Sequence, residues 1–464
     1  MFKLKNGKGL RVPAKASLSY SLAGALAKGT GLLFTPIFTR VMAAEEYGRY
    51  TLYITTLALM SVVCTSPVTG SMMYKGYGEF DGERRSFTAA SMGLAFCTVP
   101  AMCLLALALR KTLGISIGFV PLLLFQLILD VGTAAMYAEL RYAYSYGRAA
   151  TLTVISALAT PMVSLLIMHV SNGAYARIFG LLLVSVAVAL PFIARCVRTG
   201  LYRGDMWKFA LRYSAPMLPG ALAASVIAQA DKLIVSAYMG AEALAPYAVA
   251  HSIGVGLTFI TASLGSALHP WMMRKLRAGE YERVGDTVSR IYSSLGALTV
   301  ILTALAPEAL SLLTPESYSV ALPAIFPIAL ATLPSFLLSV GSVAAVYAGK
   351  PYYSSVGLGA GAAVNVLANI LAVPRLSYLG AGFSLLLSYA VAAGVSYLLP
   401  AGRRVLRDMK LGNIARTSLS TASMAVIVTF FYGSLPARIL LLIIPVGALI
   451  YSAVGMREYV TESA

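Results

Sequence analysis

Four charged side chains lie inside long apolar segments of this sequence, where water does not solvate them. They are Lys28, Asp130, Asp231 and Lys232. A charge that faces lipid costs roughly 2.5 to 3.5 kcal/mol on an insertion scale, so each of the four needs a partner or a water-filled cavity. A cation at such a place can bind an anionic group, and an acid there can take up a proton or a sodium ion. These residues are therefore the first candidates for a functional site.

Two pairs of polar residues occur at the spacing of one helical turn. Gln126 and Asp130 form one pair, and Asn365 and Asn369 form the other. Residues four apart lie on one face of a helix. Each pair either makes hydrogen bonds between helices or lines a polar cavity for ligand hydroxyl groups or a coupling cation. Both alternatives stay open from the sequence.

A further charged set follows the first apolar segment. Arg40 and Arg49 flank Glu45 and Glu46 in a short polar stretch that we expect near the outer face. These four residues form either a structural loop network or part of an outer gate. His251 lies near the start of a later apolar segment, where we expect it to be close to water.

The elements that must position these residues are membrane-spanning helices. The 464 residues are 58% hydrophobic and only 12% charged, with a mean hydropathy of +0.78. Soluble proteins carry about 25% charged residues. The apolar runs are about 20 residues long and do not alternate with period two, which indicates helices rather than a β-barrel. We predict fourteen spans, at residues 16–42, 50–73, 87–109, 115–138, 150–170, 177–195, 213–239, 246–272, 291–313, 320–346, 354–373, 379–399, 414–433 and 438–455.

The charge balance follows from the topology. Lys and Arg total 36 against 18 Asp and Glu, which gives a formal charge of +18. With the amino terminus in the cytoplasm, about three quarters of the basic residues fall on the cytoplasmic side, as the positive-inside rule predicts. We therefore expect a multi-pass protein of the cytoplasmic membrane whose basic loops face anionic lipid headgroups, and no nucleic-acid partner.

The chain contains a weak internal repeat. Residues 24–27 recur at 220–223, and a second match at nearly the same offset relates Met42, Ala44, Glu45 and Tyr50 to Met239, Ala241, Glu242 and Tyr247. Six spans separate the copies, so the two halves share one orientation. Parallel repeats of this kind are a transporter design in which the substrate site lies between the halves. We predict an amino-terminal lobe at 1–200, a carboxyl-terminal lobe at 201–402 and a final helix pair at 403–464.

The loops leave little room for other function classes. None is predicted to be long enough for a catalytic domain, so we expect no enzyme, and no phosphate-cradling G-x-x-x-x-G-K-[ST] loop occurs. No clusters of acid, base or arginine typical of a glycan polymerase or ligase are evident. The four cysteines lack metal-site spacing, and we expect no cofactor.

Two stretches carry a family resemblance. Thr39-Arg40-Val41-Met42 leads into Glu45-Glu46-Tyr47-Gly48 and Tyr50, and in the seventh span Pro216 and Pro219 precede Asp231-Lys232, Gly240 and Tyr247. This pattern resembles the polysaccharide-repeat-unit flippases, the Wzx-type branch of the multidrug/oligosaccharidyl-lipid/polysaccharide exporter superfamily. The resemblance implies two six-helix lobes around a central cavity. It also implies movement of a lipid-linked oligosaccharide from the cytoplasmic to the outer leaflet.

The resemblance gives the intramembrane charges specific roles. Lys28 would bind the pyrophosphate of a polyprenyl carrier, and Asp231 would pair with Lys28 when substrate is absent. Protonation of Asp231, or sodium binding to it, would then release Lys28. We expect Lys232, about 100° from Asp231 around the helix, to extend to the interface or to contact other helices.

The leading hypothesis is thus a secondary transporter that flips lipid-linked oligosaccharide by alternating access, with proton or sodium coupling left open. The alternative is a cation-coupled multidrug exporter of the same superfamily, and a membrane glycan polymerase or ligase is a weaker one. The expected partners are the lipid-linked oligosaccharide and membrane lipids, with other glycan-assembly proteins as further candidates.

Overall fold

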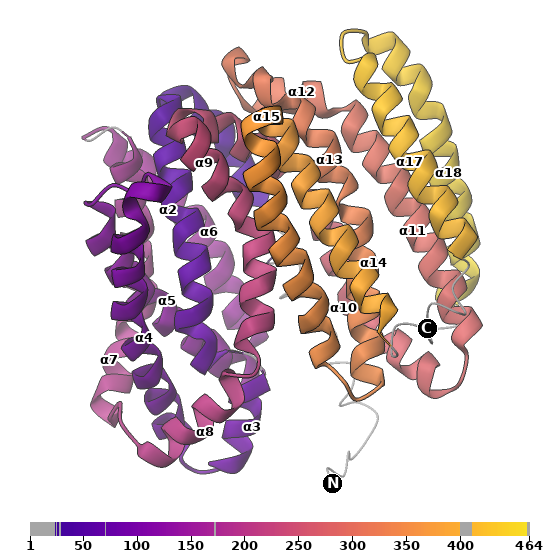
Figure 1. Cartoon of the computed structure of the whole chain (residues 1–464). Coiled ribbons are helices and arrows are strands. Elements are labelled where there is room, and N and C mark those ends of the chain that lie inside the picture. Colours follow the sequence, from indigo (N-terminus) through magenta and orange to yellow (C-terminus); the bar gives the residue numbers. More distant parts are fainter. Residues whose placement is uncertain are drawn as a thin grey trace. The chain divides into compact units, whose positions relative to one another are not determined.

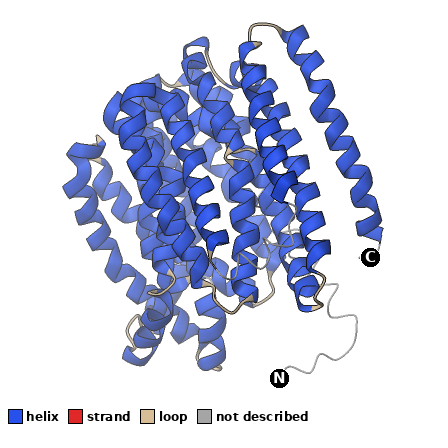
Figure 2. Cartoon of the chain, turned by 45° about the vertical axis from the view of Figure 1, so that its right-hand side comes forward, coloured by secondary structure: helices blue, strands red, loops and turns tan. Residues whose placement is uncertain are grey.

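The computed structural model is built of helices joined by short turns, and it contains no strand in the residues that it describes (Figure 2). These residues are 24, 26, 29–69, 71–170, 173–399 and 411–461, with the backbone alone described at 71–74, 266–267 and 451–461. The prediction of an all-α membrane protein is confirmed, because long apolar runs satisfy their backbone hydrogen bonds only within helices.

The order of the helices along the chain can be followed by colour in Figure 1. Residues 29–41 form a first, unlabelled helix. The elements after it are α2 (Ala44–Thr65), η1 (Ser66–Val68), α3 (Ser71–Glu79), α4 (Arg84–Leu113), α5 (Phe119–Tyr142), α6 (Tyr146–Met168), α7 (Ala174–Thr199), α8 (Gly204–Ser214), α9 (Leu218–Gly254), α10 (Leu257–Arg277), α11 (Tyr281–Ala304), α12 (Ala306–Leu313), η2 (Glu316–Ala324), α13 (Ile325–Leu330), α14 (Thr332–Tyr347), α15 (Tyr352–Leu398), α17 (Leu411–Phe430) and α18 (Leu435–Thr461).

Nine helical segments among the described residues are long and apolar enough to cross a bilayer by length and composition. They are Ala44–Val68, Arg84–Leu113, Phe119–Tyr142, Tyr146–Met168, Ala174–Thr199, Leu218–Gly254, Tyr281–Ala304, Glu316–Tyr347 and Tyr352–Leu398. Each of the fourteen predicted spans overlaps a helix of the described chain. The last two predicted spans correspond to α17 and α18.

Two of the longest helices are each interrupted by one residue. Gly240 in α9 has φ 86° and ψ 170°, and Ser377 in α15 has φ 54° and ψ −134°. Glycine reaches this region at no steric cost because it has no Cβ atom. The two interruptions fall between predicted spans, so the prediction that α9 and α15 each contain more than one span is confirmed.

Several predicted boundaries are wrong, and two spans show the reason. The span at 291–313 in fact begins ten residues earlier, at the start of α11, and is divided before α12. Hydropathy follows apolar runs, whereas helix geometry continues through the charged first turns of α11. The span at 246–272 is divided by a turn at residues 255–256, between α9 and α10.

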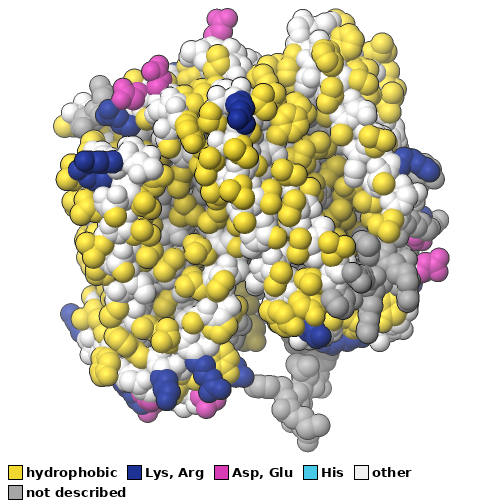
Figure 3. Space-filling model, viewed as in Figure 1, with side chains coloured by type: hydrophobic (Ala, Val, Ile, Leu, Met, Phe, Trp, Pro, Cys, Tyr) yellow, Lys and Arg dark blue, Asp and Glu magenta, His cyan; other side chains and the backbone are white. Residues whose placement is uncertain are grey.

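The described residues divide into two compact units. The first comprises the chain up to Leu222 together with Gly240–Glu242, and the second comprises Ala223–Met239 and the chain from Ala243 onward. The three-part division at residues 200 and 402 stays a prediction. Hydrophobic side chains cover the flanks of the helices, and Lys and Arg gather near the helix ends (Figure 3). This distribution is what a lipid-facing surface requires.

Each unit has its own core. In the first, Tyr77 and Phe87 pack with residues of α5 and α8. In the second, α10, α11 and α14 meet around Met272, Tyr292 and Phe336. The cores hold the helices that carry the buried polar residues described next.

Small residues allow the two parts of α15 to approach each other closely. A Cβ atom at Gly361 would lie 2.7 Å from the Ser388 carbonyl oxygen, and one at Gly357 would lie 2.2 Å from Ser396 Oγ. Neither position therefore has space for a side chain. This contact fixes the helix segment that carries Asn365 and Asn369.

Candidate functional site

A network of acidic, basic and hydroxyl groups lies inside the second unit. The Tyr247 hydroxyl donates to Asp231 Oδ2 at 2.5 Å. Lys232 Nζ lies 3.4 Å from Asp231 Oδ1, and His251 Nε2 lies 3.4 Å from Asp231 Oδ2. Lys232 Nζ also lies 3.3 Å from His251 Nε2 and donates to the Ala228 carbonyl at 2.8 Å. Asp231 is fully buried, and Lys232 and His251 are 9% and 8% exposed.

The interruption of α9 positions this network. Asp231 precedes Gly240, whereas Tyr247 and His251 follow it and are one helical turn apart. The change of direction at Gly240 lets the second part of the helix bring its hydroxyl and imidazole groups to the carboxylate of the first. The ring of Tyr378 stacks on Tyr247, with ring centroids 6.2 Å apart and ring planes 10° from parallel.

The network balances its own charge. A buried carboxylate or ammonium is tolerated only when it is paired and hydrogen-bonded. Here the Lys232 ammonium is the counter-ion of Asp231, and both carboxylate oxygens have partners. Gain or loss of one proton at Asp231 or His251 changes the net charge of the network without any added ion. In the part of the chain that the structure describes, no group of three or more His, Cys, Asp or Glu side chains has a metal-binding arrangement.

The structure decides two predictions about this region. Of the two alternatives for Lys232, extension to the interface is wrong, because the side chain pairs with Asp231 and donates to the Ala228 carbonyl. Its contact with His251, which follows the interruption at Gly240, matches the alternative of contact with another predicted span. His251 is not near water but belongs to the buried network. Lys28 lies outside the described residues, so its pairing with Asp231 stays a prediction.

The two asparagines of α15 are buried and only partly satisfied. Asn369 Nδ2 donates to the Asn365 carbonyl at 2.8 Å and to Asn365 Oδ1 at 3.2 Å. The remaining amide atoms, Asn365 Nδ2 and Asn369 Oδ1, have no hydrogen-bond partner. Gly361, one turn before Asn365, faces Ile227, one turn before Asp231. The asparagines are therefore on the helix that packs beside the network.

A second polar cluster lies in the first unit. Gln126 Nε2 donates to Asp130 Oδ1 at 2.8 Å and to Ser185 Oγ of α7 at 3.1 Å. Ser61 of α2 also hydrogen-bonds to Asp130. Gln126 is 1% exposed, and its Oε1 atom has no partner. Gln126 therefore makes a hydrogen bond between helices, which is one of the two alternatives predicted for the Gln126 and Asp130 pair.

Three of the four charged residues after the first span form a network. Arg49 bridges Glu45 at 2.6 Å and Glu46 at 2.9 Å, and Glu46 Oε2 accepts from the Ala174 amide at the start of α7 at 2.8 Å. A carboxylate at a helix amino terminus satisfies a free N–H group and the helix dipole. Arg40 instead donates to the Pro36 carbonyl at 3.1 Å. The geometry matches the structural alternative, and a gating role stays a prediction.

Arg177 was not predicted as a site residue. Its guanidinium carbon lies 4.0 Å from the ring centroid of Phe38, 5.1 Å from that of Tyr47 and 3.7 Å from that of Tyr50. Its Nη1 atom is buried without a hydrogen-bond partner. These cation–π contacts join the first helix, α2 and α7. The sequence signal available was an arginine near the start of an apolar helix, with aromatic residues about 130 positions earlier in the chain.

Comparison with solved structures identifies the fold. The lipid II flippase MurJ, in an inward closed conformation, is similar with a TM-score of 0.70 and 13% identity, over 95% of this chain and 99% of that one. An inward-facing multidrug resistance MATE family transporter of the MOP superfamily has a TM-score of 0.60 and 14% identity, over 86% of this chain and 98% of that one. A MOP superfamily transporter from Pyrococcus furiosus has a TM-score of 0.56 and 15% identity, over 87% of this chain and 99% of that one.

Comparison by sequence identifies the family. No curated protein sequence matches the chain. The model of the family described as polysaccharide biosynthesis protein matches residues 14–275, which are more than half of the chain. The resemblance seen in the two sequence stretches is thereby confirmed. The chain is a multi-pass membrane protein with the fold shared by MurJ and MATE transporters, and it belongs to the polysaccharide biosynthesis protein family.

Proposed function

We propose that this protein flips a lipid-linked oligosaccharide, the repeat unit of a polysaccharide, from the cytoplasmic to the outer leaflet by alternating access. The observation that carries the proposal is membership of the polysaccharide biosynthesis protein family, together with a fold similar to that of a lipid II flippase. A polyprenyl-linked sugar has a large polar headgroup, so it needs a protein path through the apolar region of the bilayer.

The proposed location is the cytoplasmic membrane, with the amino terminus in the cytoplasm. The support is the positive-inside bias of the 36 basic residues. Lys28, twelve residues into the first span predicted from the sequence, is the proposed ligand of the carrier pyrophosphate. Other glycan-assembly proteins, which supply or use the lipid-linked sugar, are the proposed partners.

We assign the coupling of transport to protons rather than to sodium. Sodium binding needs several oxygen ligands that are free of other partners. The Asp231 carboxylate is already engaged by the Tyr247 hydroxyl and by the Lys232 ammonium. A proton needs only one lone pair, and His251 lies within 3.4 Å to exchange it. Protonation of Asp231 leaves Lys232 without its counter-ion, so the two protonation states favour different packing of α9.

The second candidate is a multidrug exporter, which the similarity to MATE transporters favours. A drug exporter for cations needs an acidic, largely apolar pocket. The intramembrane charges of the present chain include two basic residues, Lys28 and Lys232, beside the acidic residues Asp130 and Asp231. The two functions therefore predict substrates of opposite charge.

Reconstitution in liposomes tests the proposal. A labelled lipid-linked oligosaccharide is incorporated, and its accessibility in each leaflet to a membrane-impermeant glycosidase or oxidant is followed with time. We expect translocation that depends on the protein, and no accumulation of a cationic dye in the same liposomes. Dye export driven by an ion gradient, without movement of the oligosaccharide, would favour the multidrug exporter.

A further inference from the structure

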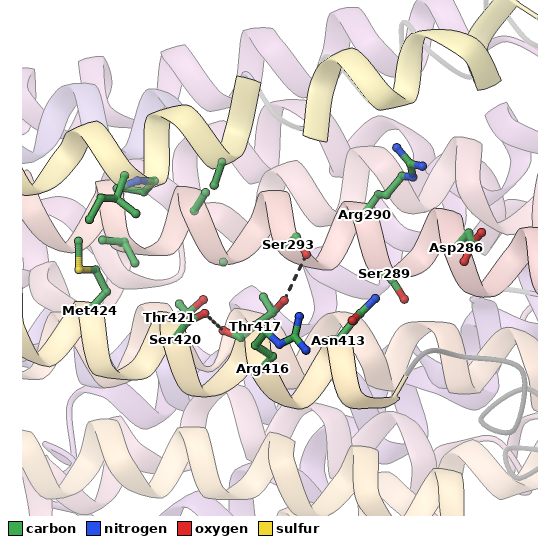
Figure 4. A pocket seen from close by; sticks show the side chains of 16 residues that line it. Asp286, Ser289, Arg290, Ser293, Asn413, Arg416, Thr417, Ser420, Thr421 and Met424 are labelled. Carbon is green, nitrogen blue, oxygen red and sulfur yellow. Dashed lines mark hydrogen bonds between the residues drawn. The ribbon is translucent and has the colours of Figure 1, made fainter. Parts of the chain in front are cut away.

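A pocket of about 600 Å³ lies in the second unit, between α11, α17 and α18. It is separate from the Asp231 network and from both asparagines. Both α17 and α18 pack along α11, whereas few residues of one contact the other in the part of the chain that the structure describes. The pocket is therefore a groove with α11 as its floor and the last two helices as its walls (Figure 4).

One end of this groove is polar. Asp286, Ser289 and Arg290 project from α11, and Asn413 and Arg416 project from α17 (Figure 4). Ser289 is 9% exposed, and its hydroxyl has no hydrogen-bond partner. A buried hydroxyl without a partner costs free energy unless a ligand or water satisfies it. This end of the groove therefore offers donors for an anionic ligand with polar substituents.

The alignment of the two helices places these polar groups at one level. Ser293 and Thr417 hydroxyls lie 3.2 Å apart. One turn further along both helices, a Cβ atom at Gly296 would lie 2.5 Å from Thr421 Oγ1. The two helices thus run in the same direction at close range. The two arginines project from different helices, Arg290 from α11 and Arg416 from α17 (Figure 4).

The other end is apolar. Val300 of α11, Met424 of α17, and Ile444 and Ala448 of α18 line it. A cluster around Val300, Ala304 and Val428, into which Leu441 of α18 packs, closes this end. From Asp286 to Val300 the groove follows 14 residues of helix, about 21 Å at 1.5 Å per residue. A ligand that fits this length has a charged head and a hydrocarbon chain.

We propose that this groove is a binding site for an anionic membrane phospholipid, with its phosphodiester at Arg290 and Arg416 and an acyl chain along the apolar end. Arginine is well suited to phosphate because its planar guanidinium donates two parallel hydrogen bonds. Basic pockets between membrane helices bind anionic headgroups in this way.

The polar end of the groove suits an anionic lipid. Its described lining holds two arginines and one aspartate. A phosphodiester such as that of phosphatidylglycerol is anionic and suits the arginines, and the glycerol hydroxyls suit Ser289 and Asn413. The test of this site does not depend on the proposed transport, because its probe is a phospholipid and not a lipid-linked sugar.

Native mass spectrometry of the purified full-length protein tests the site. The probes are phosphatidylglycerol and phosphatidylcholine with identical acyl chains. We expect phosphatidylglycerol to bind about tenfold more tightly, and Arg290→Gln with Arg416→Gln to remove that preference. Ala448→Trp, which fills the apolar end while leaving both arginines, should weaken phosphatidylglycerol binding as well. Arg277→Gln, at an exposed cationic position outside the groove, is the matched control and should bind like the wild type.

Several results would overturn the assignment. Equal binding of the two lipids to the wild type, or an unchanged preference in the double arginine variant, would show that the groove does not recognise the phosphodiester. Displacement of phosphatidylglycerol by a polyprenyl diphosphate at lower concentration would assign the groove to the substrate. If the wild type proves to be a dimer and Ala448→Trp a monomer with unchanged lipid binding, the groove would be assigned to a second copy of the chain. Unchanged thermal unfolding of each variant in detergent establishes that it is folded.

Discussion

Removal of one charge from the buried network should destabilise the second unit strongly. In Asp231→Asn the Lys232 ammonium stays buried but loses the carboxylate 3.4 Å away. A charge left without its partner inside a protein costs about 3–5 kcal/mol. Lys232→Met leaves the Asp231 carboxylate without its counter-ion and should have a cost of the same order. The assay is reversible unfolding in mixed micelles, read as the free energy of unfolding of each variant.

The double variant decides whether the two charges act as a pair. Asp231→Asn with Lys232→Met removes both charges at nearly constant volume, so we expect a smaller loss than the sum of the single variants, with a coupling of about 0.5–3 kcal/mol. Asp81→Asn, which removes an exposed partner of Arg84, is the control and should change stability little. Additive effects of the two buried substitutions would refute the pairing.

Three other predictions concern other contacts of the structure. Arg177→Leu should lower the free energy of unfolding by about 1–2 kcal/mol, because it removes contacts to three aromatic rings. An unchanged free energy of unfolding would show that these contacts do not stabilise the protein. Gly361→Leu should cost about 1–3 kcal/mol by overpacking, whereas Gly359→Leu, which has open space around it, should give as much monodisperse protein in size-exclusion chromatography as the wild type. Hydrogen bonds from Arg438 hold the pKa of Glu308 below its ordinary value of 4.5. The pair therefore stabilises the folded state fully above pH 4.5. This contribution is lost as the pH falls through the lowered pKa of Glu308. Unfolding midpoints measured across the acidic range should therefore show a steeper decline for the wild type than for Glu308→Gln, and parallel curves would contradict this.

The sequence was informative about helices because a bilayer imposes their length. Apolar runs of about 20 residues predict spans wherever they occur. The division of α9 near Gly240 and of α15 near Ser377 was predictable, since polar or small residues separate two apolar runs. The early start of α11 was not predictable. Charged residues such as Glu282 and Arg283 are compatible with a helix, but they do not belong to an apolar run, so the hydropathy pattern does not include them.

The candidate site was predictable only in part. Asp231 and Lys232 were identified because intramembrane charge is costly wherever it points. Their partners Tyr247 and His251 were not, because the backbone turn at Gly240 decides which side chains return to the carboxylate. The same limit applies to Arg177, whose aromatic neighbours are distant in the sequence. Contacts of this kind depend on tertiary packing, which no local pattern specifies.

The most direct test of the proposed mechanism is the rate of oligosaccharide translocation in liposomes under an imposed pH gradient. For the wild type we expect a rate that rises with the pH gradient and does not respond to a sodium gradient of the same size. For the folded double variant Asp231→Asn with Lys232→Met, the translocation rate should respond to neither gradient. A wild-type rate that follows sodium alone, or a double variant that still responds to the pH gradient, would contradict proton coupling through the buried network.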